Sequence, residues 1–184
     1  MDVYETVESI LDSNNGEIVG RTAIHKLVYL SNKTIEGLTL PVYKPHYYGP
    51  YSPELSLALE KMVTYSFIDE IKIPGKMHEG YKYRLTPDGQ DMANHVKSTF
   101  PTEYQKIKYL VSTCDKFCKL KTAPLSYAAK MYFMLENNPD KEKVMDYDDA
   151  IKTAEKLGWE LTPDDVSQGV GLLKELKLVN IVKN

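Results

Sequence analysis

Residues 43–73 read YKPHYYGPYSPELSLALEKMVTYSFIDEIKI and combine a tyrosine-rich turn with a well-marked helix start. Ser52 suits the N-cap position, Pro53 the first helical position and Glu54 the first turn, where its charge complements the free amides. Apolar residues then recur at helical spacing at Leu55, Leu59, Met62 and Val63. A strand-like run follows at Phe67, Ile68, Ile71 and Ile73. The stretch therefore predicts a helix that leads directly into a strand.

The sequence on either side of this stretch predicts further short elements. Before it we expect a helix over 2–13, a short strand over 17–19 and a second helix over 22–35 that leaves Arg21, Lys26 and Lys33 in solvent. The connection 38–51 contains Pro41, Pro45 and Pro50 and cannot be helical. After it come a loop over 74–80, a returning strand over 81–85 and a helix from Thr86 to about Ser98. This order is that of a winged helix, with the hairpin as the wing.

The second half is predicted to be helical. Helices are expected over 102–121, 124–137 and 147–158, and Thr162 caps a fourth, followed by a terminal strand over Leu178–Val182. At an offset of 111 residues this last helix and strand align with those of residues 55–71, which indicates either a second winged-helix-like unit or the common pattern of an amphipathic helix before a strand. The expected fold is mainly α with a small antiparallel β wing. Its predicted domains are a winged helix over 1–97 and a helical domain over 98–184.

Three blocks of the first half carry a family resemblance: GRTAIHKLVYL at 20–30, PHYYGPYSPEL at 45–55 and YKYRLTPDGQDMA at 81–93. They resemble a family of uncharacterised prokaryotic winged-helix proteins, the YwgA-like family of predicted transcriptional regulators. The first block and the YGP turn are more distantly similar to phage-associated antitoxins of the Panacea type. The resemblance implies a winged-helix fold and DNA binding, although fold alone does not determine function.

Composition and charge limit the classes of protein to consider. The chain has 184 residues, 42% of them hydrophobic, and no apolar run approaches the roughly 18 residues of a membrane span. The acidic N-terminus is unlike a signal peptide, so we expect a cytoplasmic protein that does not enter the membrane. The net charge is −3, but residues 97–135 hold seven basic and two acidic side chains, a local net charge of +5. Six of these basic residues form a helix face that is either simply solvated or tracks phosphate: Lys97, Lys106, Lys108, Lys116, Lys119 and Lys121.

Catalytic and metal-binding patterns are lacking. Cys114 and Cys118 lie one helical turn apart, without the further ligands of a zinc site, and are interpreted as buried small side chains. The four histidines show no metal-ligand spacing, and no nucleotide-binding or nucleophile motif is present. His25 is interpreted as a packed or surface side chain. We therefore expect no cofactor, no metal and no enzymatic activity.

The first functional hypothesis is a transcriptional regulator that binds duplex DNA, as a homodimer whose contacts come from the second half. The helix from Ser52 would enter the major groove and the wing would contact phosphate. The candidate nucleic-acid-binding residues are Lys61, Lys72, Lys76, His78, Lys82 and Arg84. Against this, the exposed positions of that helix hold two acids, Glu54 and Glu60, for one base, which is unfavourable beside phosphate.

The alternative hypothesis is a protein-interaction module, resembling an antitoxin or an adaptor, that uses the tyrosine-rich connection. Tyrosine is favoured at interaction sites, and Tyr43, His46 and Tyr47 are the candidate partner-binding residues. Tyrosines can instead pack such a connection onto its own fold, and Tyr48 and Tyr51, which flank the turn, are expected to be core members.

Overall fold

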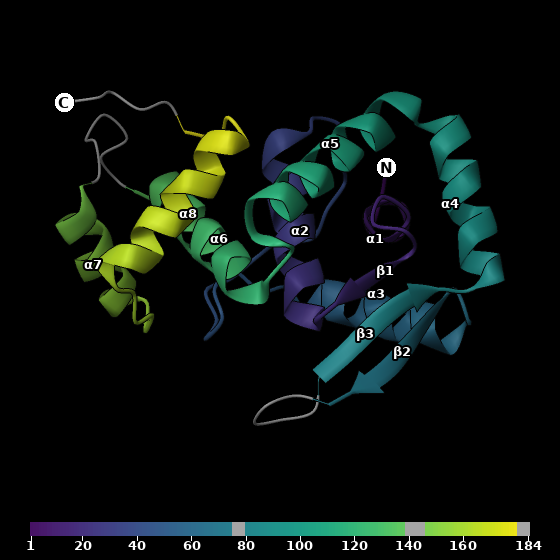
Figure 1. Ribbon diagram of the computed structural model, residues 1–184, viewed down its shortest axis with the longest axis horizontal. Coiled ribbons are helices and arrows are strands. Elements are labelled where there is room, and N and C mark those ends of the chain that lie inside the picture. The colour runs from purple at the N-terminus through teal and green to yellow at the C-terminus, as the bar shows by residue number, and fades with distance from the viewer. Residues whose placement is uncertain (75–79, 139–145, 180–184) are drawn as a thin grey trace.

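The computed structural model describes residues 1–74, 80–138 and 146–179. Within these ranges the chain forms eight helices and three strands (Figure 1). In chain order they are α1 (Val3–Asp12), β1 (Glu17–Val19), α2 (Arg21–Thr34), α3 (Pro53–Thr64), β2 (Ile68–Ile73), β3 (Gly80–Leu85), α4 (Pro87–Thr99), α5 (Pro101–Cys118), α6 (Thr122–Glu136), α7 (Tyr147–Lys156) and α8 (Pro163–Glu175). The prediction of a mainly helical chain with a small antiparallel sheet is confirmed.

The first half is built around α1. Figure 1 shows this helix with the sheet on one side and α4 and α5 arching over the other. The strand order is β1-β3-β2, and both pairs are antiparallel, with Ile18 opposite Tyr83 and Ile68 opposite Leu85. These four side chains are buried, because alternate residues of each strand face the helices.

The helix starts predicted from the sequence are formed by the expected capping residues. Ser52 Oγ accepts a hydrogen bond from the amide of Leu55 at 3.3 Å, and Thr86 Oγ1 accepts one from the amide of Gly89 at 3.1 Å. Leu55, Leu59 and Met62 are buried on the inner face of α3. The helix from Ser52 and the strand after it are therefore confirmed.

The second half is a group of helices that adjoins α2. Helix α6 packs against both α2 and α8, and α7 closes the far end of the molecule (Figure 1). Trp159, in the segment between α7 and α8, is 1% exposed. One continuous apolar core runs through both halves, from Val7 and Ile10 of α1 to Leu172 and Leu173 of α8. Buried residues from both predicted domains, 1–97 and 98–184, thus belong to the same apolar cluster.

Lys26, the two cysteines and the predicted terminal strand can be compared with the structure as far as it describes them. Lys26 was expected in solvent, but this prediction is wrong: α2 is enclosed on all sides and Lys26 is 1% exposed. Cys114 and Cys118 are both buried, as interpreted. The predicted terminal strand Leu178–Val182 lies outside the described residues from residue 180 onward, and Leu178 and Val179 belong to no strand.

In the parts of the chain that the structure describes, no helix is long and apolar enough to cross a membrane.

Candidate functional site

The tyrosine-rich connection ends in a closed loop, Tyr43–Tyr51, which we call the tyrosine loop. Lys44 and Tyr51 form a small antiparallel bridge in which each amide donates to the other's carbonyl oxygen at 2.9 Å. At the tip, the amide of Gly49 donates to the carbonyl oxygen of His46 at 2.8 Å. Gly49 has φ +97°, and a Cβ there would lie 3.0 Å from Cγ of Lys130, so the loop is held close to α6.

Two buried donors anchor this loop from different parts of the chain. Lys26 Nζ on α2 donates to the carbonyl oxygen of Pro50 at 2.6 Å, and Trp159 Nε1 donates to the carbonyl oxygen of His46 at 2.6 Å. Both bonds satisfy backbone oxygens that a loop cannot satisfy by itself. The burial of Lys26 follows from this anchoring role, and neither Lys26 nor Trp159 was identified from the sequence. No local signal marked Lys26, because α2 also carries polar residues such as Arg21 and Lys33 and the acceptor of the Lys26 ammonium comes from another segment.

The tyrosines of the loop divide into exposed and packed side chains. Tyr47 and Tyr48 are 72% and 58% exposed, and their rings meet edge to face with centroids 4.9 Å apart. The expectation that Tyr48 belongs to the core is therefore wrong, because the turn at Gly49-Pro50 directs it outward. Tyr51 does pack inward, since its ring is stacked on His25 with centroids 4.9 Å apart and an interplanar angle of 10°.

Tyr43 is partly buried, in contrast to the exposed aromatic surface expected of it. Its ring meets that of Tyr29 edge to face with centroids 5.0 Å apart, and burial raises the pKa of its hydroxyl. It lines a hollow of about 410 Å³ between α2 and α6, beside the ion pair of Lys33 with Glu136 at 2.6 Å. The candidate partner-binding residues thus separate, with His46 and Tyr47 exposed and Tyr43 packed.

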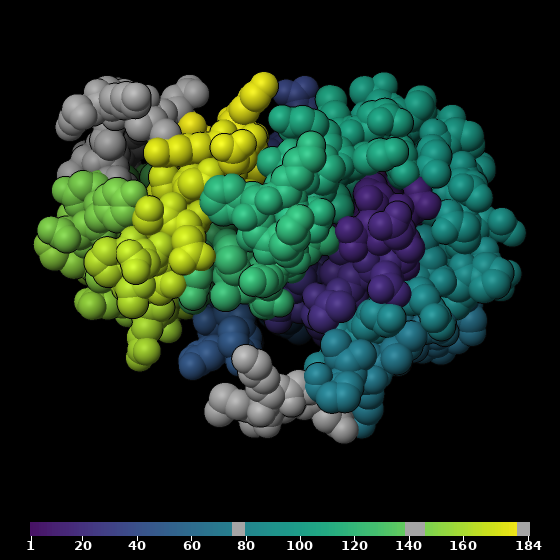
Figure 2. All heavy atoms as spheres, viewed as in Figure 1, coloured from purple at the N-terminus to yellow at the C-terminus, as the bar shows by residue number. Residues whose placement is uncertain are grey.

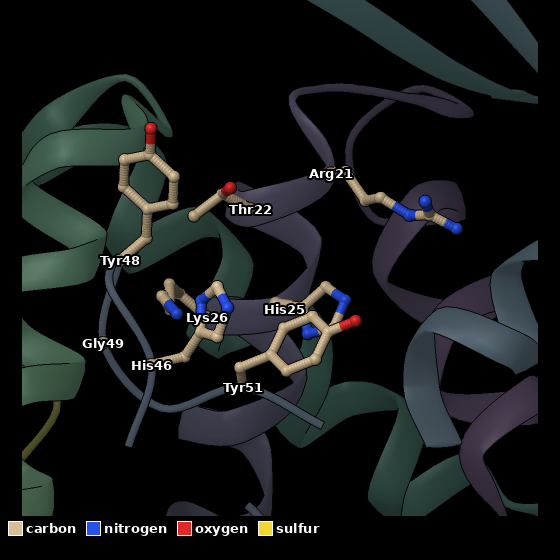
Figure 3. Close-up of a pocket in the computed structure, with 8 residues that line it drawn as sticks. All are labelled: Arg21, Thr22, His25, Lys26, His46, Tyr48, Gly49 and Tyr51. Carbon is tan, nitrogen blue, oxygen red and sulfur yellow. The ribbon is translucent and has the colours of Figure 1, made fainter. Parts of the chain in front are cut away.

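A smaller pocket of about 110 Å³ lies between the first turns of α2 and the inner side of the tyrosine loop (Figure 3). Helix α2 contributes Arg21, Thr22, His25 and Lys26, and the loop contributes His46, Tyr48, Gly49 and Tyr51. Four of these eight side chains are basic and none is acidic. The guanidinium of Arg21 points away from the others toward α3, where Nη2 donates to the carbonyl oxygen of Ser56 at 3.2 Å and to Glu60 Oε1 at 3.1 Å.

His25 is a buried, uncharged member of this pocket. It is 2% exposed, and Nε2 lies 3.2 Å from Ser56 Oγ, which in turn lies 2.8 Å from the Tyr51 hydroxyl. Burial, together with the nearby charges of Lys26 and Arg21, lowers the pKa of His25 to about 3. Nδ1 is buried without a hydrogen-bond partner in the described part of the chain.

Near neutral pH, Lys26 is divided between its protonated and its neutral form. Burial, with a smaller contribution from the positive charge of Lys130, lowers the pKa of Lys26 to about 7. Lys130 is itself buried, and its ammonium lies 5.6 Å from the centre of the Trp159 ring. The pocket is therefore lined by one buried amine, that of Lys26, and Lys130 lies near it, where the charge of Asp165 interacts favourably with the Lys130 ammonium.

The candidate nucleic-acid-binding residues are spread over α3 and the sheet. Lys61 and Lys72 are exposed, but Lys82 Nζ lies 3.0 Å from Glu17 Oε2 and Arg84 Nη2 lies 3.1 Å from Asp69 Oδ2. Lys76 and His78 fall outside the described residues. The basic helix α5 lies across α1 from the sheet (Figure 1), so the two basic regions are not neighbours. Lys97 at the end of α4 is engaged with Asp12 at 3.0 Å.

No group of three or more His, Cys, Asp or Glu side chains within residues 1–74, 80–138 and 146–179 could hold a metal ion. The polar groups that do converge are the basic and hydroxyl groups of the pocket, which suit an anion better than a cation.

Fold and site together define a mainly helical protein with a small antiparallel sheet and an aromatic loop over a basic pocket. No protein-family model matches the chain. It is 30% identical over 170 residues to the uncharacterized protein YwgA of Bacillus subtilis (strain 168), an alignment that covers 91% of this chain and 92% of the relative. The chain therefore belongs to the YwgA family, which confirms the resemblance seen in the sequence.

Proposed function

We propose that this protein is a protein-interaction module in which a winged helix carries the tyrosine loop as its binding surface. The observation that carries the proposal is the exposure of Tyr47 and Tyr48 on a loop that buried hydrogen bonds hold in place. Tyrosine is enriched at protein interfaces, and a loop that is already ordered loses little conformational entropy on binding.

The winged-helix part of the proposal rests on the order of the elements. Helix α1, strand β1 and helices α2 and α3 are followed by the β2–β3 hairpin, and the sheet order β1-β3-β2 places the hairpin beside the first strand. This is the connectivity expected of a winged helix. The long connection between α2 and α3, which contains the tyrosine loop, replaces the tight turn of a DNA-reading helix-turn-helix.

The chemistry of the loop favours a partner with an acidic surface. Residues 37–53 contain no acidic side chain, and Lys44 and His46 are exposed beside the tyrosines. In Figure 2 part of this connection projects as a dark-blue ridge at the lower edge of the molecule, below α6. The resemblance of the YGP turn to Panacea-type antitoxins supports a partner that is a protein, as an antitoxin has.

The test is quantitative affinity capture from the native host, followed by binding measurements with the purified partner. Tyr47→Ala with Tyr48→Ala should reduce capture. The double variant should also raise the dissociation constant about tenfold or more, which is the loss of affinity typical of interface aromatic residues. Tyr65→Ala is the matched control, because Tyr65 is 69% exposed but lies at the end of α3. Equal recovery of every captured protein by the wild type and the double variant would refute the proposal.

Binding of duplex DNA is the second candidate, and the element order is the observation that favours it. In this proposal a homodimer would place α3 in the major groove, with Lys61 and Lys72 toward phosphate. The exposed glutamates of α3 weaken it because they repel phosphate, and Lys82 and Arg84 weaken it because carboxylates already pair with them. Salt-dependent retardation of DNA that Lys61→Glu with Lys72→Glu abolishes would support this candidate, and no retardation at low salt would exclude it.

A non-enzymatic role is part of the proposal. Ser56 and His25 are adjacent, but an imidazole with a pKa of about 3 is a poor general base near neutral pH. The described residues also place no carboxylate on Nδ1 to orient the ring. The pair is better explained as part of the support for Tyr51.

A further inference from the structure

The pocket beneath the tyrosine loop has the features of a site for an anion. Its lining includes Thr22, Lys26 and His46, which can all donate hydrogen bonds, and no carboxylate. Its volume of about 110 Å³ is several times the space that one water molecule needs. A small oxyanion would fit this space.

The start of α2 adds a favourable electric field to the pocket. Gly20 is the N-cap residue, and no side chain among the described residues caps the helix there. Arg21 and Thr22, the first two helical residues, line the pocket. The first turn of α2 therefore borders the pocket, and the positive end of a helix dipole with its free amides is the feature that phosphate sites at helix N-termini use.

Two buried nitrogen atoms of the pocket have fewer hydrogen-bond partners among the described residues than buried polar groups usually have. His25 Nδ1 has no hydrogen-bond partner in the described part of the chain, although the side chain is 2% exposed. The described residues offer Lys26 Nζ one acceptor, the carbonyl oxygen of Pro50, for as many as three protons. Unsatisfied buried polar groups are costly, so both groups indicate a ligand that fills the pocket.

We propose that this pocket binds a phosphate group, held by the first-turn amides of α2, Thr22, Lys26 and His46, with His25 behind it. Phosphate fits better than a planar carboxylate because its tetrahedral oxygens can meet donors that come from the helix end, the lysine and the loop. A phosphate hydroxyl can also donate to Nδ1 of His25 when the ring is in the tautomer that leaves Nδ1 as an acceptor. The bound anion would balance the positive charge of Lys26, whose side chain lines the pocket.

The site and the proposed partner surface differ in Tyr47, which is exposed and does not line the pocket, whereas Tyr48 is exposed and also lines the pocket. Tyr47→Ala alone therefore tests the partner surface without changing the pocket lining. The site is nevertheless coupled to the loop, since Lys26 would contact the phosphate and Pro50 at the same time. Phosphate binding is therefore expected to slow hydrogen exchange at the amides of Tyr48 and Gly49.

The experiment titrates the purified protein with inorganic phosphate, adenosine monophosphate and acetate, followed by calorimetry and by amide and imidazole NMR signals. Saturable phosphate binding should move the signals of Arg21–Ala23 and raise the pKa of His25. Phosphate binding without binding of the nucleotide identifies the free ion as the ligand, and binding of both identifies a phosphate monoester. Both outcomes support the site.

Two variants and a control localise the binding. Lys26→Met should weaken phosphate binding about tenfold or more, and Thr22→Val several-fold, while Lys116→Met, which changes an exposed lysine on α5, should leave it unchanged. Thr22→Val keeps the test valid if Lys26→Met fails to fold. The proposal is overturned if the wild type shows no saturable binding up to about 10 mM phosphate, which would detect a dissociation constant near 1 mM. Equal affinity for acetate would also overturn it.

Discussion

The indole Nε1 of Trp159 donates a 2.6 Å hydrogen bond to the carbonyl oxygen of His46, 113 residues earlier in the chain. The bond joins the segment between α7 and α8 to the tyrosine loop. Trp159 also meets Phe133 of α6 edge to face, with ring centroids 5.9 Å apart, so its position is fixed by the core of the second half. The second half thus determines the conformation of a loop that belongs, by sequence, to the first.

Trp159→Phe should loosen the tyrosine loop while keeping an aromatic ring in the core. The lost hydrogen bond leaves a backbone oxygen unsatisfied, which should lower the free energy of unfolding by about 1–3 kcal/mol. Hydrogen exchange at the amides of Tyr48 and Gly49 should accelerate, while the amide of Leu85 in the sheet, bonded to Gly16, should be unaffected. Unchanged exchange in the loop would show that this bond does not hold it.

Lys26 should make the protein more stable as the pH rises from about 7 toward 10. In the unfolded chain this lysine keeps its proton up to its ordinary pKa of 10.5, whereas burial lowers the pKa to about 7 in the folded protein. The unfolded state therefore binds more protons in this window, and each pKa unit of difference is worth about 1.4 kcal/mol. Urea unfolding should show that the free energy of unfolding rises more between pH 7 and pH 9 for the wild type than for Lys26→Met. An equal rise in the two proteins would contradict the prediction.

Glu8 should have the opposite effect at lower pH. It is buried on α1, and its Oε2 has no hydrogen-bond partner among the residues that the structure describes. Burial, reinforced by the charges of Asp2 and Glu5, raises the pKa of Glu8 from 4.5 to about 7. The folded state then binds more protons between pH 4.5 and 7, so this contribution to stability is present below pH 4.5 and lost as the pH rises through 7.

Glu8→Gln should therefore stabilise the protein at pH 8 by about 1 kcal/mol or more and have little effect at about pH 3, where Glu8 is neutral in both the folded and the unfolded state. Chemical denaturation at the two pH values measures this difference. Glu155→Gln, on the exposed side of α7, is the control and should change little at either pH. A stabilisation that is equal at both pH values would contradict the assigned cause.

Gly169 and Gly171 form a matched pair on α8. A Cβ at Gly169 would lie 2.8 Å from the backbone carbon of Tyr127 on α6, whereas one at Gly171 would lie 3.0 Å from the ring of Phe117, which is 40% exposed and can move. Gly169→Ala should therefore lower the free energy of unfolding by about 1–3 kcal/mol. Gly171→Ala should be neutral or stabilise by up to about 1 kcal/mol, because alanine favours a helix. Equal effects in thermal unfolding would contradict close packing of α8 on α6.

Much of the secondary structure could be predicted because its signals are local. Ser52 and Thr86 cap helices through hydroxyls that reach an amide three residues later, and the alternation of Tyr83 and Leu85 follows from the geometry of one strand. Side-chain exposure in the connection could not be predicted in the same way. Tyr48 and Tyr51 lie three residues apart, yet one is exposed and the other is stacked on His25.

The sequence by itself determined the helices, the small sheet and the membership of the YwgA family, because capping, periodicity and identity are properties of neighbouring or aligned residues. Only the tertiary structure decided that Lys26 is buried, that Trp159 anchors the loop and that a basic pocket forms. These three features depend on which distant segments of the chain meet. A lysine on a helix carries no local signal that its ammonium will be buried and will donate to a carbonyl oxygen of another segment. The pocket is lined by residues of α2 and the tyrosine loop alone, but Trp159 of the second half holds that loop in place, so the site depends on contacts that no local pattern shows.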